Sequence, residues 1–477
     1  MMGNFTLKNI YLALAVIFVF LSVSGLAETA EAATPNIKWA KSFDRFFSDA
    51  NSIQQTSDGG YIAAGGMERF GNDDSRDYAW VAKLDASGNT IWQKRFYGVE
   101  NAEASSIQQT SDGGYIVAGR TGRYERNSWG DFSIVYNAWV VKLNARGNIV
   151  WQKNFGGSRE DSANSIQQTK DGGYIFAGMT SSADGDVTGN HEDGDIWVVK
   201  LNASGGIVWQ KYFGGTGSDY ANSIQQTSDD GYIVAGTINN PTDKASENFN
   251  PYDAFVIKLN ASGNIMWQKS FGDSGWNTAN FIQQTSDDGY IFAGYTLPSA
   301  ADYNEAWIVK LNASGDIEWQ KHLGGSGGDE ANSIQQTDDG GYIFAGYTTS
   351  NDGDVVGVHG LGDLWIVKLN ASGDIVWQKC FGGSAWDYAN SIQQTNDGGY
   401  IVAGSTYSTG SDMTDNHDNR YSLVVKLNAS GNIVWQEYFS DRGYDDGDDS
   451  GCNAGFGLLA FVTMGALPFV FRKNIRQ

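Results

Sequence analysis

SIQQTSDDGYIVAG, residues 223–236, is one of seven near-identical stretches in a chain of 477 residues. The other six copies begin at Ser52, Ser106, Ser165, Phe281, Ser333 and Ser391. Successive copies start roughly 52 to 59 residues apart, a longer period than that of most helical repeat arrays. The repeat, rather than the length, therefore decides how the chain is organised.

One repeat, residues 219–271, reads as four β-strands. DYANSIQQT is followed by an Asp-Gly pair typical of a tight hairpin, and YIVAGT is a continuous apolar run, as expected for a strand buried on both faces. A variable polar loop leads to DAFVIKLN, and ASGN then turns the chain into IMWQKSFG. The sequence therefore predicts four antiparallel strands per repeat.

A lone four-stranded sheet with two apolar faces would not be soluble, so the repeats must stack on one another. Stacking around an axis buries both faces of every sheet, and closure of the ring leaves no open end. We therefore predict an all-β fold, a seven-bladed β-propeller of four-stranded antiparallel blades over residues 36–440.

The fourth strand, marked by a tryptophan, occurs eight times rather than seven. The tryptophans are Trp39, Trp92, Trp151, Trp209, Trp267, Trp319, Trp377 and Trp435. Either the Trp39 or the Trp435 strand is therefore surplus. We expect one of them to complete the last blade and to form a clasp between the chain ends.

The amino-acid composition agrees with an all-β fold, and the net charge makes one class of partner unfavourable. The chain has 61 glycines, 16 tryptophans and 23 tyrosines, which suits many short strands and tight turns. Its net charge of −23 disfavours nucleic acid as a partner. Its two cysteines cannot form a disulfide framework.

Both chain ends read as targeting segments. Residues 1–33 have an apolar run and an Ala30-Glu31-Ala32 motif, which predicts a signal peptide cleaved after Ala32 or, alternatively, after Ala27. An acidic Gly-rich linker, residues 441–451, precedes residues 452–477, whose apolar run ends in basic residues. As a helix this run would span about 27 Å, so a transmembrane helix with the repeats outside the cytoplasm is predicted.

The stretch SGCNAGFG, residues 450–457, resembles the C-terminal sorting signals of the GlyGly-CTERM and Synerg-CTERM type. That resemblance implies removal of the tail by an intramembrane protease and transfer to the cell surface, with Cys452 belonging to the processing signal. A permanent membrane anchor is the alternative. The expected location is the cell surface, the outer membrane or the extracellular space.

The repeats themselves resemble bacterial secreted β-propeller repeat proteins, through GGYIVAG, WVVKLNASGNIVWQK-like phrases and the joint at residues 213–227. The resemblance supports the fold. It implies little about activity, because such propellers serve as binding platforms, adhesins and surface-layer components, and some carry glycanase names.

Residues that depart from the repeat are the best candidates for function. Trp276 and Trp386 replace small or polar residues in the joints between blades, and Trp129 lies in a long loop. Exposed indole rings stack well on sugars and on aromatic groups, so these three are the candidate ligand-binding residues. The alternative is that they fold back onto the ring.

Two loops between the second and third strands share a pattern of acids and a histidine. Asp184, Asp186 and His191 recur in register as Asp352, Asp354 and His359. Carboxylates spaced by one residue could share calcium, but the full calcium-loop pattern is absent and Asp-Gly-Asp is also ordinary turn chemistry. A histidine beside two carboxylates could also suit a transition metal, which is the weaker alternative to calcium, and otherwise no cofactor is expected.

No asymmetric catalytic set is visible in the sequence. We expect the repeated glutamines to form hydrogen bonds between blades, some also lining the channel. The joint acids Asp161, Asp219, Asp329 and Asp387 are expected to cap turns, and the Asn-Ala-Ser phrases to form hairpins. A nucleophile elbow, a C-x-x-C pair and a phosphate-binding loop are all missing from the sequence.

The leading hypothesis is therefore an exported, non-enzymatic propeller that binds extracellular glycan or protein, with the C-terminal tail meeting the membrane and a sorting protease. One alternative is an endoglucanase-like carbohydrate hydrolase using acids at irregular positions. These are Glu68, Glu100, Glu160, Glu305 and Glu330. The other alternative is a structural component of a surface layer.

Overall fold

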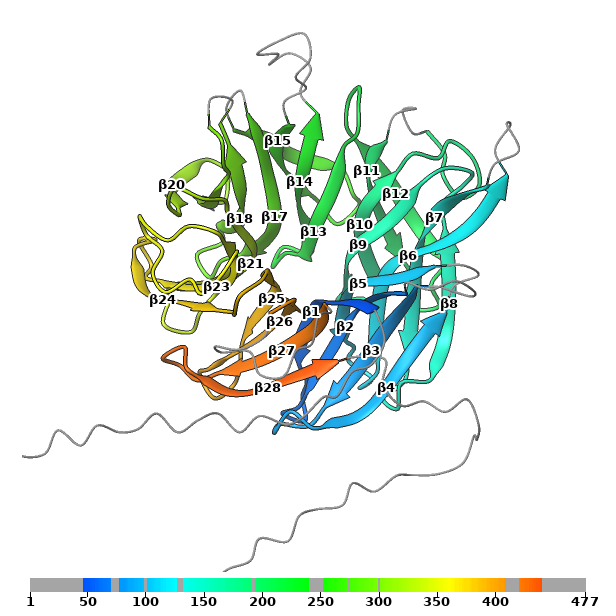
Figure 1. The fold of residues 1–477 in the computed structure, drawn as a ribbon. Helices are drawn as coiled ribbons and strands as arrows, with labels where there is room; N and C mark the ends of the chain where they lie inside the picture. The colour runs from blue at the N-terminus through cyan, green and yellow to red at the C-terminus, as the bar shows by residue number, and fades with distance from the viewer. Residues whose placement is uncertain are drawn as a thin grey trace, which may run out of the picture.

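The computed structural model describes nine segments: residues 46–69, 77–97, 101–126, 132–189, 194–239, 252–272, 275–298, 301–408 and 420–439. These residues form 28 β-strands in seven blades of four antiparallel strands, arranged as a ring (Figure 1). The predicted seven-bladed propeller is confirmed. The predicted signal peptide, linker and sorting segment, with Ala32 and Cys452, lie outside the described residues. No helix able to cross a membrane occurs within these nine segments.

The first strand of each blade is the innermost and carries the repeated Ser-Ile-Gln-Gln phrase. These strands are β1 (Phe46–Gln55), β5 (Ala102–Gln109), β9 (Asp161–Gln168), β13 (Tyr220–Gln226), β17 (Trp276–Gln284), β21 (Asp329–Gln336) and β25 (Asp387–Gln394). The second strands are β2 (Tyr61–Arg69), β6 (Tyr115–Arg126), β10 (Tyr174–Thr180), β14 (Tyr232–Asn239), β18 (Tyr290–Leu297), β22 (Tyr342–Thr348) and β26 (Tyr400–Thr406).

The third strands carry the Val-Lys-Leu-like phrase. They are β3 (Tyr78–Leu84), β7 (Phe132–Leu143), β11 (Asp195–Leu201), β15 (Tyr252–Leu259), β19 (Glu305–Leu311), β23 (Asp363–Leu369) and β27 (Tyr421–Leu427). The fourth, outermost strands are β4 (Thr90–Tyr97), β8 (Ile149–Phe155), β12 (Ile207–Phe213), β16 (Ile265–Phe271), β20 (Ile317–Leu323), β24 (Ile375–Phe381) and β28 (Ile433–Phe439).

The core consists of seven apolar clusters, each formed by two adjacent blades. The second and third strands are buried along almost their whole length, as their continuous apolar runs predict. At every junction the fourth-strand tryptophan of one blade meets the tyrosine that begins the second strand of the next. The two rings lie edge to face with centroids 5.5–5.8 Å apart.

The ring closes between the seventh and first blades through this same junction. Trp435 of β28 packs on Tyr61 of β2, and the Gln55 N–H donates to Gln393 Oε1. Trp435 therefore belongs to the strand that completes the last blade. Each blade consists of four consecutive strands, so among the described residues no strand is exchanged between the chain ends. The clasp itself stays a prediction. Trp39 lies outside the described residues.

Candidate binding site at the loop-side rim

The ring has two unlike faces, because consecutive connections in an antiparallel blade lie at opposite ends of the strands. One face, here the hairpin face, carries the turns between strands one and two and between strands three and four. The other, the loop face, carries the loops between strands two and three and the joints to the next blade. Hairpin-face turns are almost the same in every blade, whereas loop-face connections differ in length and residue type.

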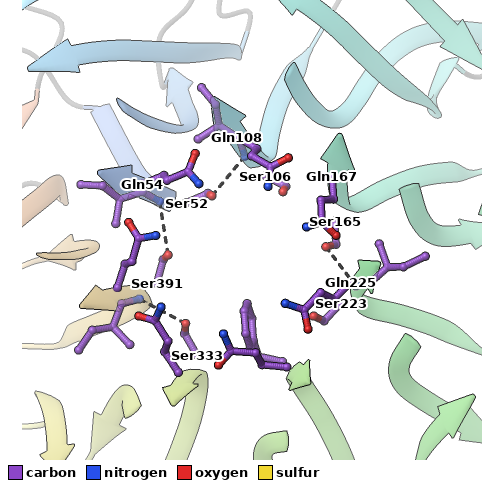
Figure 2. Close-up of a pocket in the computed structure, with 18 of the residues that line it drawn as sticks. Ser52, Gln54, Ser106, Gln108, Ser165, Gln167, Ser223, Gln225, Ser333 and Ser391 are labelled. Atoms are coloured by element: carbon purple, nitrogen blue, oxygen red, sulfur yellow. Dashed lines mark hydrogen bonds between the residues drawn. The ribbon is translucent and has the colours of Figure 1, made fainter. Parts of the chain in front are cut away.

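The repeated Ser-Ile-Gln-Gln phrase joins neighbouring blades around the channel. The Oε1 of the first glutamine accepts the backbone N–H of the second glutamine in the next blade, at 2.6–2.8 Å, at all seven junctions. The Oε1 of the second glutamine accepts a backbone N–H from the preceding blade, at 2.8–2.9 Å, also at all seven. The predicted hydrogen bonding between blades is present, and the first glutamines also line the channel (Figure 2).

On the hairpin face, each blade buries a lysine against the aspartate of its first turn. In the first blade Lys83, 4 % exposed, donates to Asp58 at 3.0 Å and to the carbonyl of Leu84. Partial burial raises the pKa of the Asp58 carboxyl, but hydrogen bonds from Thr56, Lys83 and the Gly60 N–H outweigh it and lower the pKa to about 2. The same pairing occurs in all seven blades, which identifies it as structural.

The Asn-Ala-Ser phrases form the other hairpins, as expected. Asn202 Oδ1 accepts the N–H groups of Ser204 and Gly206, and Asn260 Oδ1 does the same with Ser262 and Asn264. The side chain thus satisfies the turn's own backbone.

On the loop face, the joint acids cap backbone turns. The Asp387 carboxylate accepts hydrogen bonds from the Thr406 and Ser408 hydroxyls and from the Gly383 N–H, and it is fully buried. Burial raises the pKa of Asp387 to about 6, with a smaller contribution from Asp363, although these hydrogen bonds oppose the shift. Burial likewise raises the pKa of Asp161 and of Asp329, which bond a threonine, a serine and a glycine N–H in the same way.

The residue just before the buried alanine of each inner strand differs from blade to blade. We call these seven positions the loop-side rim: Asp49, Glu103, Ser162, Tyr220, Thr278, Glu330 and Tyr388. All are half-buried in the described structure, except that Thr278 is 4 % exposed. Further along each inner strand, the serine and first-glutamine positions that line the channel are almost the same in every blade. Along the inner strands, the variation in residue type is therefore confined to the rim.

Glu330 and its neighbours form one half of the rim. Asn304 donates to Glu330 Oε1 at 2.6 Å, and the Tyr347 hydroxyl donates to the same oxygen at 3.2 Å. Burial raises the pKa of Glu330 despite these two hydrogen bonds. Burial next to Glu330 also raises the pKa of Tyr295 to about 12, and it raises the pKa of Tyr347. Burial thus makes ionisation of both the carboxyl and the phenol groups less favourable here than in water.

Arg420, of the seventh blade, links that half to the first blade. Its guanidinium lies over the rings of Tyr388 and Tyr407, at 5.8 Å and 5.2 Å from the centroids, and pairs with Asp49 at 2.5 Å. Burial raises the pKa of Asp49, although Arg420 opposes the shift. The Tyr388 and Tyr347 rings are 5.0 Å apart.

Glu103 of the second blade continues this network. It accepts a hydrogen bond from Asn51 at 3.3 Å and pairs with Arg120 at 2.8 Å, and Arg120 lies 4.6 Å from the centroid of the Tyr136 ring. Side-chain contacts therefore join each blade to the next along the loop face from the fifth blade to the second.

The structure places two of the three predicted tryptophans. Trp386 is 38 % exposed and stacks on Tyr388 with centroids 6.1 Å apart, so it borders the rim. Trp276 is 44 % exposed and packs edge to face on Tyr252, at the joint two blades away. The two indoles are thus not brought into one site. Trp129 lies outside the described residues.

The two Asp-Gly-Asp loops are tied to the backbone of the preceding joint. Asp184 Oδ1 accepts the Ser158 N–H at 2.7 Å, and Asp352 Oδ1 accepts the Ser326 N–H at 2.6 Å. His359 Nδ1 lies 2.8 Å from Asp363 Oδ2. Asp186 and Asp354 lie in the same two loops, and His191 falls outside the described residues.

Within the described residues, no group of three or more His, Cys, Asp or Glu side chains could hold a metal ion. Asp352, Asp354 and His359 therefore do not form such a group as placed, and calcium binding there stays a prediction.

Of the acids considered for hydrolysis, Glu330 is itself a rim residue. Glu68 and Glu160 are exposed, Glu305 is 3.7 Å from His322 Nδ1 on the outer strands, and Glu100 lies outside the described residues. Sequence reasoning did not single out Asp49, Glu103, Tyr347, Tyr388 or Arg420. Aligning the seven copies on the buried alanine would have shown that the position before it never settles on one residue type.

No family model and no curated protein matches the sequence. Solved structures are similar at the level of the ring. The β-propeller domain of the Trilobed protease from Pyrococcus furiosus is 10 % identical, with TM-score 0.41, over 80 % of this chain and 94 % of that one.

Two further solved structures are similar in the same way. YCF48 bound to D1 peptide is 6 % identical, with TM-score 0.42, over 84 % and 99 % of the two chains. Sucrose-6-phosphate hydrolase from Lactobacillus gasseri is 10 % identical, with TM-score 0.33, over 84 % and 88 %. At such values these likenesses say nothing about what this chain binds, and the fold rests on its own strand pairing.

Proposed function

We propose that this propeller is a non-enzymatic binding module that takes an extracellular glycan or protein on the loop-side rim. One observation carries the proposal: side chains vary at the rim, while the channel and the hairpin face repeat the same contacts in every blade. A position that only had to hold the ring together would be expected to carry the same residue throughout, as the glutamines do.

The rim chemistry favours a neutral ligand rich in hydroxyl or amide groups. Tyr347, Tyr388 and Trp386 offer aromatic faces, and Glu330 offers a carboxyl group whose pKa is raised by burial. The two arginines of this rim network are already paired with carboxylates. A polyanion would meet a chain of net charge −23, which opposes its approach.

The test is retention of the purified protein on a panel of insoluble and soluble polysaccharides, with new reducing ends measured in the same tubes. We expect retention without turnover. Trp386→Ala and Tyr388→Ala should each weaken binding about tenfold, the equivalent of 1.4 kcal/mol. Met266→Ala, an exposed apolar side chain at the hairpin end of β16, is the control and should bind normally. Equal retention of all four proteins would overturn the rim as the site.

A carbohydrate hydrolase is the second candidate, and Glu330 is the observation that favours it. A carboxyl group with a raised pKa is what a general acid needs. New reducing ends that disappear in Glu330→Gln would replace the binding module with an enzyme. Running the panel with calcium and with a chelator also tests the Asp-Gly-Asp loops.

The proposed setting is outside the cytoplasm, with the signal peptide removed and the tail at residues 452–477 processed or retained in a membrane. The support is the sequence of the two chain ends. Mass spectrometry of the protein from its native cell would test this. A chain starting near residue 33 and ending near Cys452 is expected, and an intact tail in the membrane fraction would favour permanent anchoring instead.

A further inference from the structure

The central channel contains a second, independent feature, a ring of seven side-chain amides. The first glutamines of the inner strands line a channel cavity of about 230 Å³ together with the serines and isoleucines beside them. These glutamines are Gln54, Gln108, Gln167, Gln225, Gln283, Gln335 and Gln393. Figure 2 shows serine and glutamine side chains from different blades around one opening.

The orientation of each amide is fixed by the backbone of the next blade. Gln283 Oε1 accepts the Gln336 N–H at 2.8 Å, and the other six glutamines make the equivalent bond. An amide flip would set an NH₂ group against that N–H donor and lose the bond, so the oxygen must face the backbone. The Nε2 groups are left for the channel, and within the described residues none of the seven donates a hydrogen bond.

The serines that line the channel are oriented like the glutamines, with the side-chain oxygen accepting a backbone N–H from the next blade. Ser333 Oγ accepts the Ile392 N–H at 3.3 Å, and five other blades repeat this bond. Each hydroxyl therefore keeps its hydrogen to donate. Phe281 takes the serine position in the fifth blade and breaks the series there.

We propose that this ring binds a small oxyanion or carboxylate group on the channel axis. The lining contains no charged side chain, and its glutamine NH₂ groups and serine hydroxyls are donors at two levels. Groups with several acceptor oxygens satisfy such donors best, and charge on the acceptor strengthens each bond. A subset of the amides contacts the anion directly and water bridges it to the rest, because one small anion cannot reach seven side chains.

The test uses one channel variant and one matched control in the full-length protein. Gln283→Glu keeps an oxygen for the Gln336 N–H but replaces the channel NH₂ with a negatively charged acceptor. Gln336→Glu adds the same charge at a second glutamine, whose Oε1 accepts the Ser286 N–H and which does not line the channel.

Sulfate, acetate and chloride are titrated below about 20 mM, where general salt effects on stability are small. Sulfate or acetate should raise the Tm of the wild type and of Gln336→Glu by about 2–4 °C in a saturable way, and should leave Gln283→Glu unchanged. Chloride should do much less than either. A response to sulfate alone marks a free inorganic oxyanion as the ligand, and an equal response to acetate marks a carboxylate group.

Crystals of the wild type soaked in selenate provide a measurement that does not depend on how the variants fold. Anomalous density on the channel axis at the level of the amide ring is expected. The proposal fails if the axis is empty, or if all three proteins respond equally to sulfate. The rim variants leave the channel unchanged, so their effect on glycan binding does not alter the anion titrations or the selenate result. The rim proposal and the channel proposal are therefore tested independently.

Discussion

The repeated turn aspartates of the hairpin face and the joint aspartates of the loop face are held in opposite ways. In the seventh blade, Asp397 on the hairpin face pairs with buried Lys426, and its pKa is lowered to about 2. Asp387 on the loop face of the same blade is buried beside Asp363, and its pKa is raised to about 6. The hairpin-face turn stabilises negative charge with hydrogen bonds from Thr395, Lys426 and a backbone N–H, whereas the loop-face joint acid is buried where charge is unfavourable. Carboxyl groups whose pKa is raised by burial are common at binding sites and active sites.

The largest expected effect tests how tightly the hairpin face is built. Gly431 has φ +76°, and a Cβ there would lie 2.7 Å from the Trp377 ring. Gly431→Ala should lower the free energy of unfolding by about 2–4 kcal/mol, since left-handed strain and overpacking add. Urea denaturation measures this.

Gly398→Ala is the matched control in the same blade. Gly398 has nearly the same φ, +77°, but a Cβ there meets nothing within 4 Å. Aspartate occupies the corresponding position at Asp230 and Asp288, with φ 63°. The substitution should therefore cost only about 1 kcal/mol of backbone strain. Equal costs for the two glycines would mean that the junction with Trp377 is not tightly packed.

The second prediction concerns the pH dependence of stability, which should have opposite signs for the two aspartates. The raised pKa of Asp387 means that the folded state holds its proton more tightly than the unfolded state does. Its favourable contribution is present below about pH 4 and is lost as the pH rises through about 6, a change of about 3 kcal/mol. Asp387→Asn should flatten the stability profile in this range, measured by denaturation at a series of pH values.

Asp397 should act in the other direction and at lower pH. Because its folded pKa is lowered, its contribution is present above about pH 4 and is lost as the pH falls toward 2. Asp397→Asn should flatten only that acid limb. Profiles that change in the same range for both variants would contradict the difference between the faces.

The fold could be predicted from the sequence because independent features of the repeat indicate the same structure. The turn pairs, the apolar second strand and the tryptophan of the fourth strand recur in each copy. It reached the hydrogen bonds of the glutamines for the same reason. It named Glu330 as an acid but missed its contact with Tyr347, and it missed the pair of Arg420 with Asp49. These contacts depend on the geometry of the joints and on closure of the ring. It chose Trp276 and Trp386 for their type, and only the structure shows that they lie at separate joints.

The smallest expected effect separates binding from folding at the rim. Tyr388→Phe and Tyr347→Phe remove hydroxyl groups from half-buried rings and leave the packing between those rings in place. Tyr388→Phe should change the free energy of unfolding by no more than about 0.5 kcal/mol, and Tyr347→Phe, which loses the hydrogen bond to Glu330, by about 1 kcal/mol, both measured by urea denaturation. If the rim serves ligand binding, the same substitutions should still reduce retention on whichever glycan the wild type binds. A large loss of stability would instead assign these tyrosines to the ring, because side chains kept for a ligand contribute little to the fold that presents them.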